Sequence, residues 1–439
     1  MKHILLLLLF AFHVSCFTAF AQDLKPCGTS VLARAHATHG DRSRGLSARR
    51  PTGPVPVSRD YQGEKRGLII LVSFPDQKFG SEDPKALWQA IVNQEGYSDN
   101  GAKGSVSDYF RDQSYGQFHL SFDIVGPVET KNPYAYYGTN IDWGPPTGWF
   151  DQNVGELVDE VCHAVDDSVH FADYDWDADG KVEQIFLLYA GHGENDYYAK
   201  DSTVIWPHMA TLSVDWPGYE EGITLQGVRI DTYACGNEIN RNNKLEGMGT
   251  ICHEFSHCLG LPDLYDTKKG TSVLGNYDLM DQGCYSGGGW CPTGYSSYER
   301  YACGWLTPDP VEDAQTVTSL EPLHLQPDVR IYRRSPESAD YYLIECREKT
   351  SWDSYLPTAG LMAWHIDYDE TAWNENTVNN DPKHLRVERM SLNKVPADIS
   401  AVSLDASDNG IWYDLQGRRL SGRPTQKGIY IHNGLVFSF

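Results

Sequence analysis

Three residues in the stretch GTICHEFSHCLGLPDLYD, residues 249–266, have the types and spacing that a catalytic metal site needs. His253 and His257 are four positions apart, so a helix places both imidazoles on one face, close enough to bind a single Zn²⁺. Glu254 lies beside the first histidine and can reach a water on the metal. Zinc lowers the pKa of such a water to about 7, and a carboxylate can take its proton and pass it to a leaving amine. The pattern predicts metal-assisted hydrolysis with Glu254 as the general base.

The residues after this helix supply a possible third ligand. Gly260 and Pro262 both stop a helix, so the chain turns and brings Asp263 back towards the histidines. The two histidines could instead simply pack or meet solvent. The order of the residues, the glycine stop and the following carboxylate together favour a zinc site made by both histidines and Asp263.

A second candidate site lies in the acidic loop DYDWDADGKVE, residues 173–183. Asp175, Asp177 and Asp179 alternate ahead of a glycine and are followed by Glu183, a spacing that can wrap a hard cation such as calcium in oxygen ligands. The twelfth position counted from Asp175 is Phe186, so a complete EF-hand is excluded. The alternative is an acidic turn without an ion.

The elements that must position these residues follow from hydrophobic patterns. Continuous apolar runs in RGLIILVSF (66–74) and KVEQIFLLYAGHG (181–193) predict buried strands, and the alternation through Leu120, Phe122 and Ile124 predicts another. Helices are expected at 84–94, after the capping residue Ser105, and at 151–166. This order predicts an α+β fold in which a mixed sheet is layered with helices.

After the segment WLTP at 305–308 the sequence pattern changes from alternating strands and helices to strand-like runs. Strand-like runs YYLIEC and GLMAWHIDY predict a β-rich extension over residues 310–394. His365 and Asp367 share one face of the second run and are expected to pair with each other at the surface; the alternatives are that they approach the cleft or bind a structural cation. A small β tail is expected over 395–439, where Asn433-Gly434 between apolar runs indicates a hairpin.

Length and charge exclude several classes of protein. The chain has 439 residues, of which 41% are hydrophobic, so it can bury a large core. The formal net charge of −24 argues against a nucleic-acid partner, because phosphate binding depends on Lys and Arg. No later segment has eighteen unbroken apolar residues, so no membrane span is expected. The ten cysteines show no C-x-x-C pair, which argues against a cysteine zinc site.

The N-terminus predicts export. A basic start, an apolar run and the Ala19-Phe20-Ala21 signature indicate a signal peptide over residues 1–21, with lipid anchoring at Cys16 as the alternative. Residues 22–63 are basic and rich in Gly, Ser and Pro, which is typical of a flexible leader or of a prosegment lying across an acidic cleft. In the second case Cys27 could cap the metal and keep the protein latent.

The central segment resembles the active-site region of the immune inhibitor A family of secreted bacterial zinc metallopeptidases. The resemblance extends to GSVSDYFRDQSYGQF, DYDWDADGKVEQIFLLYAGHGE, NYDLMDQGCYSGGGWCPTGYSSYERYACGWLTP and GLMAWHIDYDE, and so covers residues 64–370. It implies a zincin-like catalytic domain, assigned to 64–309, with His253 and His257 as zinc ligands and Glu254 as the base. Met280 then resembles the methionine turn beneath the zinc, and Glu299 is a rival to Asp263 as third ligand.

The resemblance and the residues lead to the same expected function. We expect a secreted, monomeric, zinc-dependent endopeptidase that acts on proteins or peptides through a zinc-activated water, with Asp263 preferred to Glu299 because it needs only a local chain reversal. His208 and Tyr285 are possible donors to the developing oxyanion. The alternatives are a catalytically silent adhesin or binding protein on the same scaffold, and a zinc hydrolase of a non-peptide amide. The C-terminal tail resembles tails of secreted bacterial proteins that can act as sorting signals.

Overall fold

The computed structural model describes residues 61–144, 149–197, 201–311, 320–333, 335 and 338–390 of the main body. In the tail it describes 412–414, 420, 424, 429–432 and 435–438. The predicted signal peptide, the leader up to residue 60, Cys16 and Cys27 lie outside the described residues. Among those described, none of the helices has both the length and the apolar character needed to cross a bilayer.

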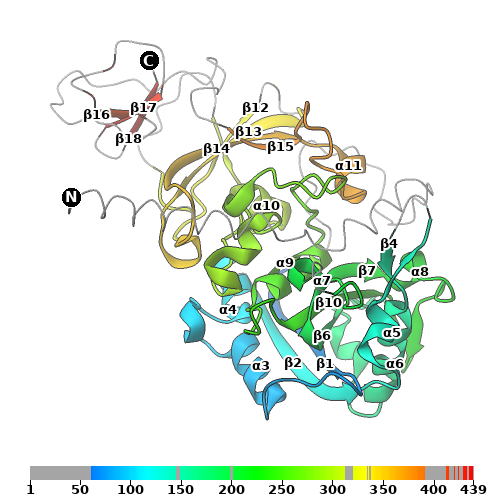
Figure 1. Cartoon of the computed structure of the whole chain (residues 1–439). Coiled ribbons are helices and arrows are strands. Elements are labelled where there is room, and N and C mark those ends of the chain that lie inside the picture. The colour runs from blue at the N-terminus through cyan, green and yellow to red at the C-terminus, as the bar shows by residue number, and fades with distance from the viewer. Residues whose placement is uncertain are drawn as a thin grey trace, which may run out of the picture.

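A five-stranded mixed sheet forms the centre of the larger part of the molecule (Figure 1). Four strands run parallel and the outer fifth is antiparallel to its neighbour. In spatial order they are β2 (Phe118–Glu129), β1 (Gly63–Ser73), β6 (Ile185–His192), β10 (Thr232–Ile239) and β7 (His208–Thr211). The strands expected from the apolar runs are confirmed, although KVEQIFLLYAGHG divides into β5 (Lys181–Val182), in a separate small sheet, and β6.

Helices cover both faces of this sheet, so its strands are buried on two sides. Alternate residues of β1 enter different cores: Ile69 and Leu71 one, Leu68 and Ile70 the other. The first core contains α3 (Pro84–Asn93), α4 (Val106–Gln113) and α9 (Gly249–Cys258), and the second contains α5 (Tyr134–Gly138) and α6 (Val154–Val165). Ser105 caps α4 as expected, through a capping box with Asp108. The predicted α+β class is therefore confirmed.

Shorter elements complete this part of the chain. They are η1 (Asp99–Gly101), β3 (Asn140–Asp142), β4 (Trp149–Asp151), η2 (Phe171–Tyr174), α7 (Glu194–Tyr197), α8 (Leu212–Asp215), β8 (Ile223–Leu225), β9 (Val228–Ile230), η3 (Gly275–Tyr277), η4 (Gln282–Gly289) and α10 (Ser297–Ala302).

Helix α9 carries the candidate metal ligands, and every one of its residues is buried. It packs against β10 on one side and η4 on another. The helix ends at its C-cap Leu259, and Gly260 follows with φ +80°, a left-handed conformation that suits glycine. The predicted glycine stop is confirmed. Because α9 lies wholly inside the protein, its side chains are held in place by packing from several directions.

Replacing Gly249 by Ala is expected to destabilise the protein by at least the ~1–3 kcal/mol typical of an overpacked core. A Cβ at Gly249 would overlap the carbonyl oxygen of Cys284, so α9 and η4 would have to separate. Urea denaturation measures the loss. Gly80→Ala is the matched control, since its Cβ would come no closer than 3.6 Å to Glu238 Oε1. Equal unfolding midpoints for the two variants would contradict the close approach.

The β-rich extension forms a second five-stranded sheet, drawn above α9 in Figure 1. Its strands in order are β11 (Asp309–Pro310), β12 (Arg330–Arg333), β13 (Asp340–Arg347), β14 (Gly360–Asp367) and β15 (Val387–Met390), with η5 (Ser351–Asp353) and α11 (Glu370–Asn374) between them. Leu343, Trp364 and Ile366 from this sheet join the same hydrophobic core as α9. The extension and helix α9 are thus parts of one packed unit.

The expected pairing of His365 with Asp367 is wrong. His365 Nε2 lies 2.9 Å from Asp340 Oδ1, while Asp367 Oδ2 pairs with His384 at 2.8 Å and Arg386 at 3.0 Å. The reason is that strand neighbours supply better partners: Asp340 on β13 lies directly opposite Asp367 on β14, and so next to His365.

In the tail, β16 (Trp412–Asp414), β17 (Ile429–His432) and β18 (Leu435–Ser438) form a three-stranded sheet. Strands β17 and β18 pair antiparallel, which confirms the expected hairpin.

Candidate metal centre

The imidazoles of His253 and His257 lie one turn apart on α9, with ring centroids 5.1 Å apart. Their Nδ1 atoms are held by backbone carbonyls: that of His253 lies 3.0 Å from the oxygen of Leu279, and that of His257 lies 2.8 Å from the oxygen of Leu261. A carbonyl oxygen only accepts hydrogen bonds, so each Nδ1 carries a hydrogen. In the neutral rings both Nε2 atoms therefore present lone pairs, which is how metal-binding histidines are usually oriented.

The Asp263 carboxylate faces both of these lone pairs. Its Oδ1 atom lies 3.2 Å from His253 Nε2 and 3.5 Å from His257 Nε2. Such close acceptors repel one another unless the rings are protonated or a cation lies among them. Ligand atoms about 2.0–2.1 Å from a tetrahedral zinc would lie roughly 3.3–3.4 Å apart, in agreement with both distances. Two nitrogens and one carboxylate oxygen are also a donor set that suits zinc.

The pKa of the Asp263 carboxyl reflects the same contacts. Burial alone would raise this pKa, but the positive charge of the neighbouring imidazoles when they are protonated, that of His257 above all, outweighs burial and holds the pKa well below its usual value. Asp263 is fully buried, so its negative charge has to be compensated by hydrogen bonds together with a positively charged neighbour or a metal ion. This is the charge that a divalent cation requires.

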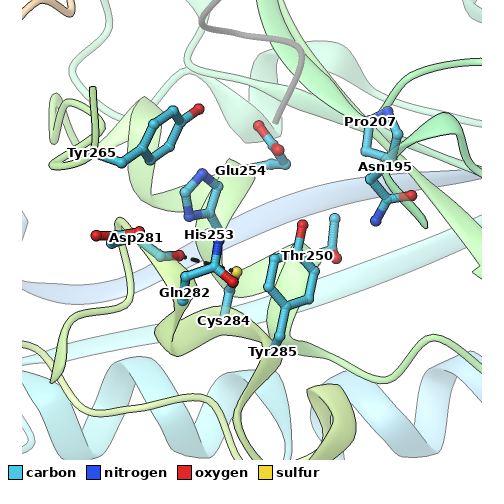
Figure 2. A pocket seen from close by; sticks show the side chains of 10 residues that line it. All are labelled: Asn195, Pro207, Thr250, His253, Glu254, Tyr265, Asp281, Gln282, Cys284 and Tyr285. Carbon is cyan, nitrogen blue, oxygen red and sulfur yellow. Dashed lines mark hydrogen bonds between the residues drawn. The ribbon is translucent and has the colours of Figure 1, made fainter. Parts of the chain in front are cut away.

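Glu254 lies close to the same two imidazoles. The side chains of His253, Glu254 and His257 offer ligand atoms that all lie within 4.8 Å of one another. Glu254 Oε2 is 4.0 Å from His257 Nε2, however, which is farther than Asp263 Oδ1 from either ring. Figure 2 shows that His253 and Glu254 line a pocket together with Tyr285. Glu254 is thus better placed to act on a water or substrate than to be a third ligand.

Glu299, the rival ligand, is used elsewhere. Its Oε2 atom accepts the Ser296 N–H at 2.7 Å in the capping box of α10, and its carboxyl group adjoins that of Asp278. No contact within ion-pair range joins it to His253 or His257 in the part of the chain that the structure describes. Burial, followed by repulsion from Asp278, raises the pKa of Glu299 well above its usual value.

Replacing Asp278 by Asn is expected to stabilise the protein at neutral pH. Burial, reinforced by the charge of Asp281, raises the pKa of Asp278 to about 6. The native state then holds a proton that the unfolded chain releases near pH 4, so the free energy of unfolding falls as pH rises from about 4 to 6. The variant lacks this penalty, and its advantage above pH 6 should be on the order of 1–3 kcal/mol.

Urea denaturation of the metal-free proteins at pH 4.5 and 7.5 measures this effect. The advantage of Asp278→Asn should be present at the higher pH and shrink at the lower one. An advantage that is independent of pH, or a loss of stability at pH 7.5, would contradict the raised pKa.

Met280 lies next to the residue that orients His253. The carbonyl of Leu279 accepts from His253, and the carbonyl of Met280 accepts the Leu264 N–H at 2.8 Å. The Met280 side chain is fully buried. The segment that resembled a methionine turn therefore connects the motif helix to the loop that carries Asp263.

The two other sequence-predicted donors have different positions. Tyr285 lines the pocket beside His253 and Glu254. His208 lies in the second core, where Nδ1 contacts the Trp206 carbonyl and Nε2 the Tyr233 hydroxyl, and burial lowers its pKa to about 4. His208 is thus a neutral packing residue.

The acidic loop gathers part of its predicted site. Carboxylates of Asp175, Asp177 and Asp179 lie within 4.8 Å of one another, and Asp175 and Asp177 both accept the Asp179 N–H at 3.1 Å. Glu183 Oε2 instead accepts the Trp176 N–H at 2.6 Å. The structure therefore brings three of the four predicted calcium ligands together.

One residue at the centre has no counterpart in the sequence-based predictions. Asn376, which follows α11 in the extension, makes two hydrogen bonds to Asp263. Nothing local in the sequence points to it, because 113 positions separate the two residues.

Known proteins are similar in sequence to this region of the chain. The sequence profile of the immune inhibitor A peptidase M6 catalytic domain matches residues 61–305. The pre-pro-metalloprotease PrtV of Vibrio cholerae is 26% identical over 292 residues, which are 54% of this chain and 30% of PrtV. Immune inhibitor A of Bacillus thuringiensis subsp. alesti is 25% identical over 305 residues, 60% of this chain and 43% of the relative. The chain thus spans less than half the length of these relatives.

Proposed function

The chain belongs to the immune inhibitor A family of M6 peptidases, and on this premise we propose that it is a secreted zinc-dependent endopeptidase. The observation that carries the proposal is the position of Asp263 Oδ1 opposite the Nε2 atoms of His253 and His257. These three atoms would hold zinc, and Glu254 would act as general base. The buried helix α9 lies between β10 of the mixed sheet and the less regular segment that contains η4, and this arrangement supports a zincin-like fold.

The roles of the chain's own residues follow from their places. Zinc held there would supply a Lewis acid that polarises the scissile carbonyl and acidifies the attacking water. Glu254 would take the proton of that water at its carboxylate and later give it to the leaving amine. Because Glu254 is fully buried, the electrostatic contacts of its carboxylate in this step are stronger than they would be in water. Tyr285, which lines the same pocket, would donate a hydrogen bond to the oxyanion.

Cleavage of internally quenched peptides of increasing length tests the substrate class. An endopeptidase should cleave an unstructured protein and long peptides much faster than a single-residue amide. Cleavage confined to small amides would indicate the non-peptide hydrolase, and a zinc-loaded chain that is inert to all of them would indicate the adhesin.

The proposal of secretion depends on the signal peptide expected at residues 1–21. A latent form would depend on the leader, residues 22–63, and on Cys27 as a cap on the metal. N-terminal sequencing of the exported protein tests both, since it shows where each segment is removed.

We also propose calcium binding by Asp175, Asp177 and Asp179. Calcium at a hundred times its dissociation constant should add about 2.7 kcal/mol to the free energy of unfolding. The melting temperature should rise with calcium in the wild type and not in Asp177→Asn. Asp167→Asn, at an exposed aspartate outside the loop, is the control. An equal rise in Asp177→Asn, or none in the wild type, would refute the site.

A further inference from the structure

A short segment of the extension, residues 376–380, binds the loop that carries Asp263 through its asparagines. Asn379 Nδ2 donates to the Leu264 carbonyl at 2.7 Å. Asn380 Oδ1 accepts the Thr267 hydroxyl at 3.0 Å and the Lys268 N–H at 3.2 Å. These contacts fix the loop backbone on both sides of Asp266. Asn376 is the member of the segment that contacts Asp263 itself.

The Asn376 amide binds Asp263 at two points. Its Oδ1 atom accepts the Asp263 backbone N–H at 2.6 Å, and its Nδ2 atom donates to Asp263 Oδ2 at 2.6 Å. The two bonds define which end of the amide is oxygen and which is nitrogen. They also occupy Oδ2 and so leave Oδ1 as the carboxylate oxygen that faces His253 and His257.

The backbone of Asn376 is set for this contact. Its φ is +54°, a left-handed conformation that Asn tolerates better than most residues. Its carbonyl lies 2.9 Å from the Thr267 hydroxyl, whose one hydrogen it shares with Asn380 Oδ1, so main chain and side chain both contact the same loop. Asp at this position would keep the acceptor but lose the donor and bring a second negative charge against Asp263.

We propose that Asn376 is a positioning residue of the metal centre, which orients the Asp263 carboxylate so that Oδ1 is presented to the zinc. The inference rests on the proposed function, in which Asp263 is the third ligand. It makes the β-rich extension part of the metal site, although the family profile ends at residue 305. Partners that orient a metal ligand typically change metal affinity 10–100-fold when removed.

Zinc affinity measured by competition with a chromophoric chelator tests this role in the full chain. Asn376→Ala and Asn376→Asp should each weaken zinc binding about 10–100-fold, and Asp by more. Asn380→Ala is the matched control, because it releases the same loop without touching Asp263 and should bind zinc within about threefold of the wild type. The cobalt-substituted Asn376→Ala protein should show an altered visible absorption band, which a merely structural defect would not produce.

The outcomes separate this inference from the function on which it rests. Asp263→Ala should weaken zinc binding more than either Asn376 variant. If Asp263→Ala weakens binding while Asn376→Ala matches the wild type in affinity and cobalt spectrum, Asn376 has no positioning role. If Asp263→Ala itself binds zinc normally, the ligand assignment fails. If Asn380→Ala weakens binding as much as Asn376→Ala, general loop docking is responsible and the proposal is overturned.

Discussion

Glu254→Gln is expected to lower kcat for peptide cleavage by about 10²–10⁴-fold while the zinc content stays at the wild-type level. Gln keeps the size of the side chain but cannot take the proton of the attacking water. Zinc should remain because Asp263 Oδ1, at 3.2 and 3.5 Å from the two Nε2 atoms, is closer to the imidazoles than the 4.0 Å of Glu254 Oε2. Steady-state cleavage and metal analysis of the same sample measure both effects.

Glu82→Gln, at an exposed glutamate, is the control and should be fully active. If the Glu254→Gln protein cleaves peptides at the wild-type rate with zinc bound, Glu254 is not the general base. If it loses zinc, Glu254 is a ligand and the division of roles between Glu254 and Asp263 is wrong.

His257→Ala is expected to abolish stable zinc binding and with it all cleavage. Two ligands bind zinc far more weakly than three, and the Leu261 carbonyl would lose the N–H that it accepts. The variant should elute from gel filtration with almost no zinc, and its melting temperature should no longer rise when zinc is added, because a ligand stabilises only a native state that binds it.

His119→Ala provides the comparison, since His119 is a partly exposed histidine on β2. It should retain zinc and activity. A His257→Ala protein that keeps one tightly bound zinc would show that the metal lies elsewhere, and one that keeps its activity without zinc would rule out a metal mechanism.

The parts of the site that the sequence predicted are those encoded locally. His253, Glu254 and His257 fall on one helix, and Gly260 turns the chain so that Asp263 returns within the same loop. The strands of the central sheet were predictable for a similar reason, since burial on both faces requires the unbroken apolar run seen in β1. In each case the spacing of residues within one segment, or one short turn, was enough for the prediction.

Features that depend on distant segments could not be predicted in this way. Asn376 reaches Asp263 across 113 positions, and no pattern around it differs from an ordinary polar turn. His365 finds Asp340 because β13 and β14 pair, which requires the register of the sheet. Glu299 is different, because its capping box with Ser296 is a local Ser-x-x-Glu signature that could have shown that its carboxylate was already in use.

The most direct test of the central claim is the zinc content of the chain from Gln22 onward, measured by mass spectrometry together with casein cleavage. The account predicts one zinc per chain, cleavage that stops when a chelator removes the zinc, and recovery when zinc is restored. Cleavage that continues at full rate in the metal-free chain would contradict it.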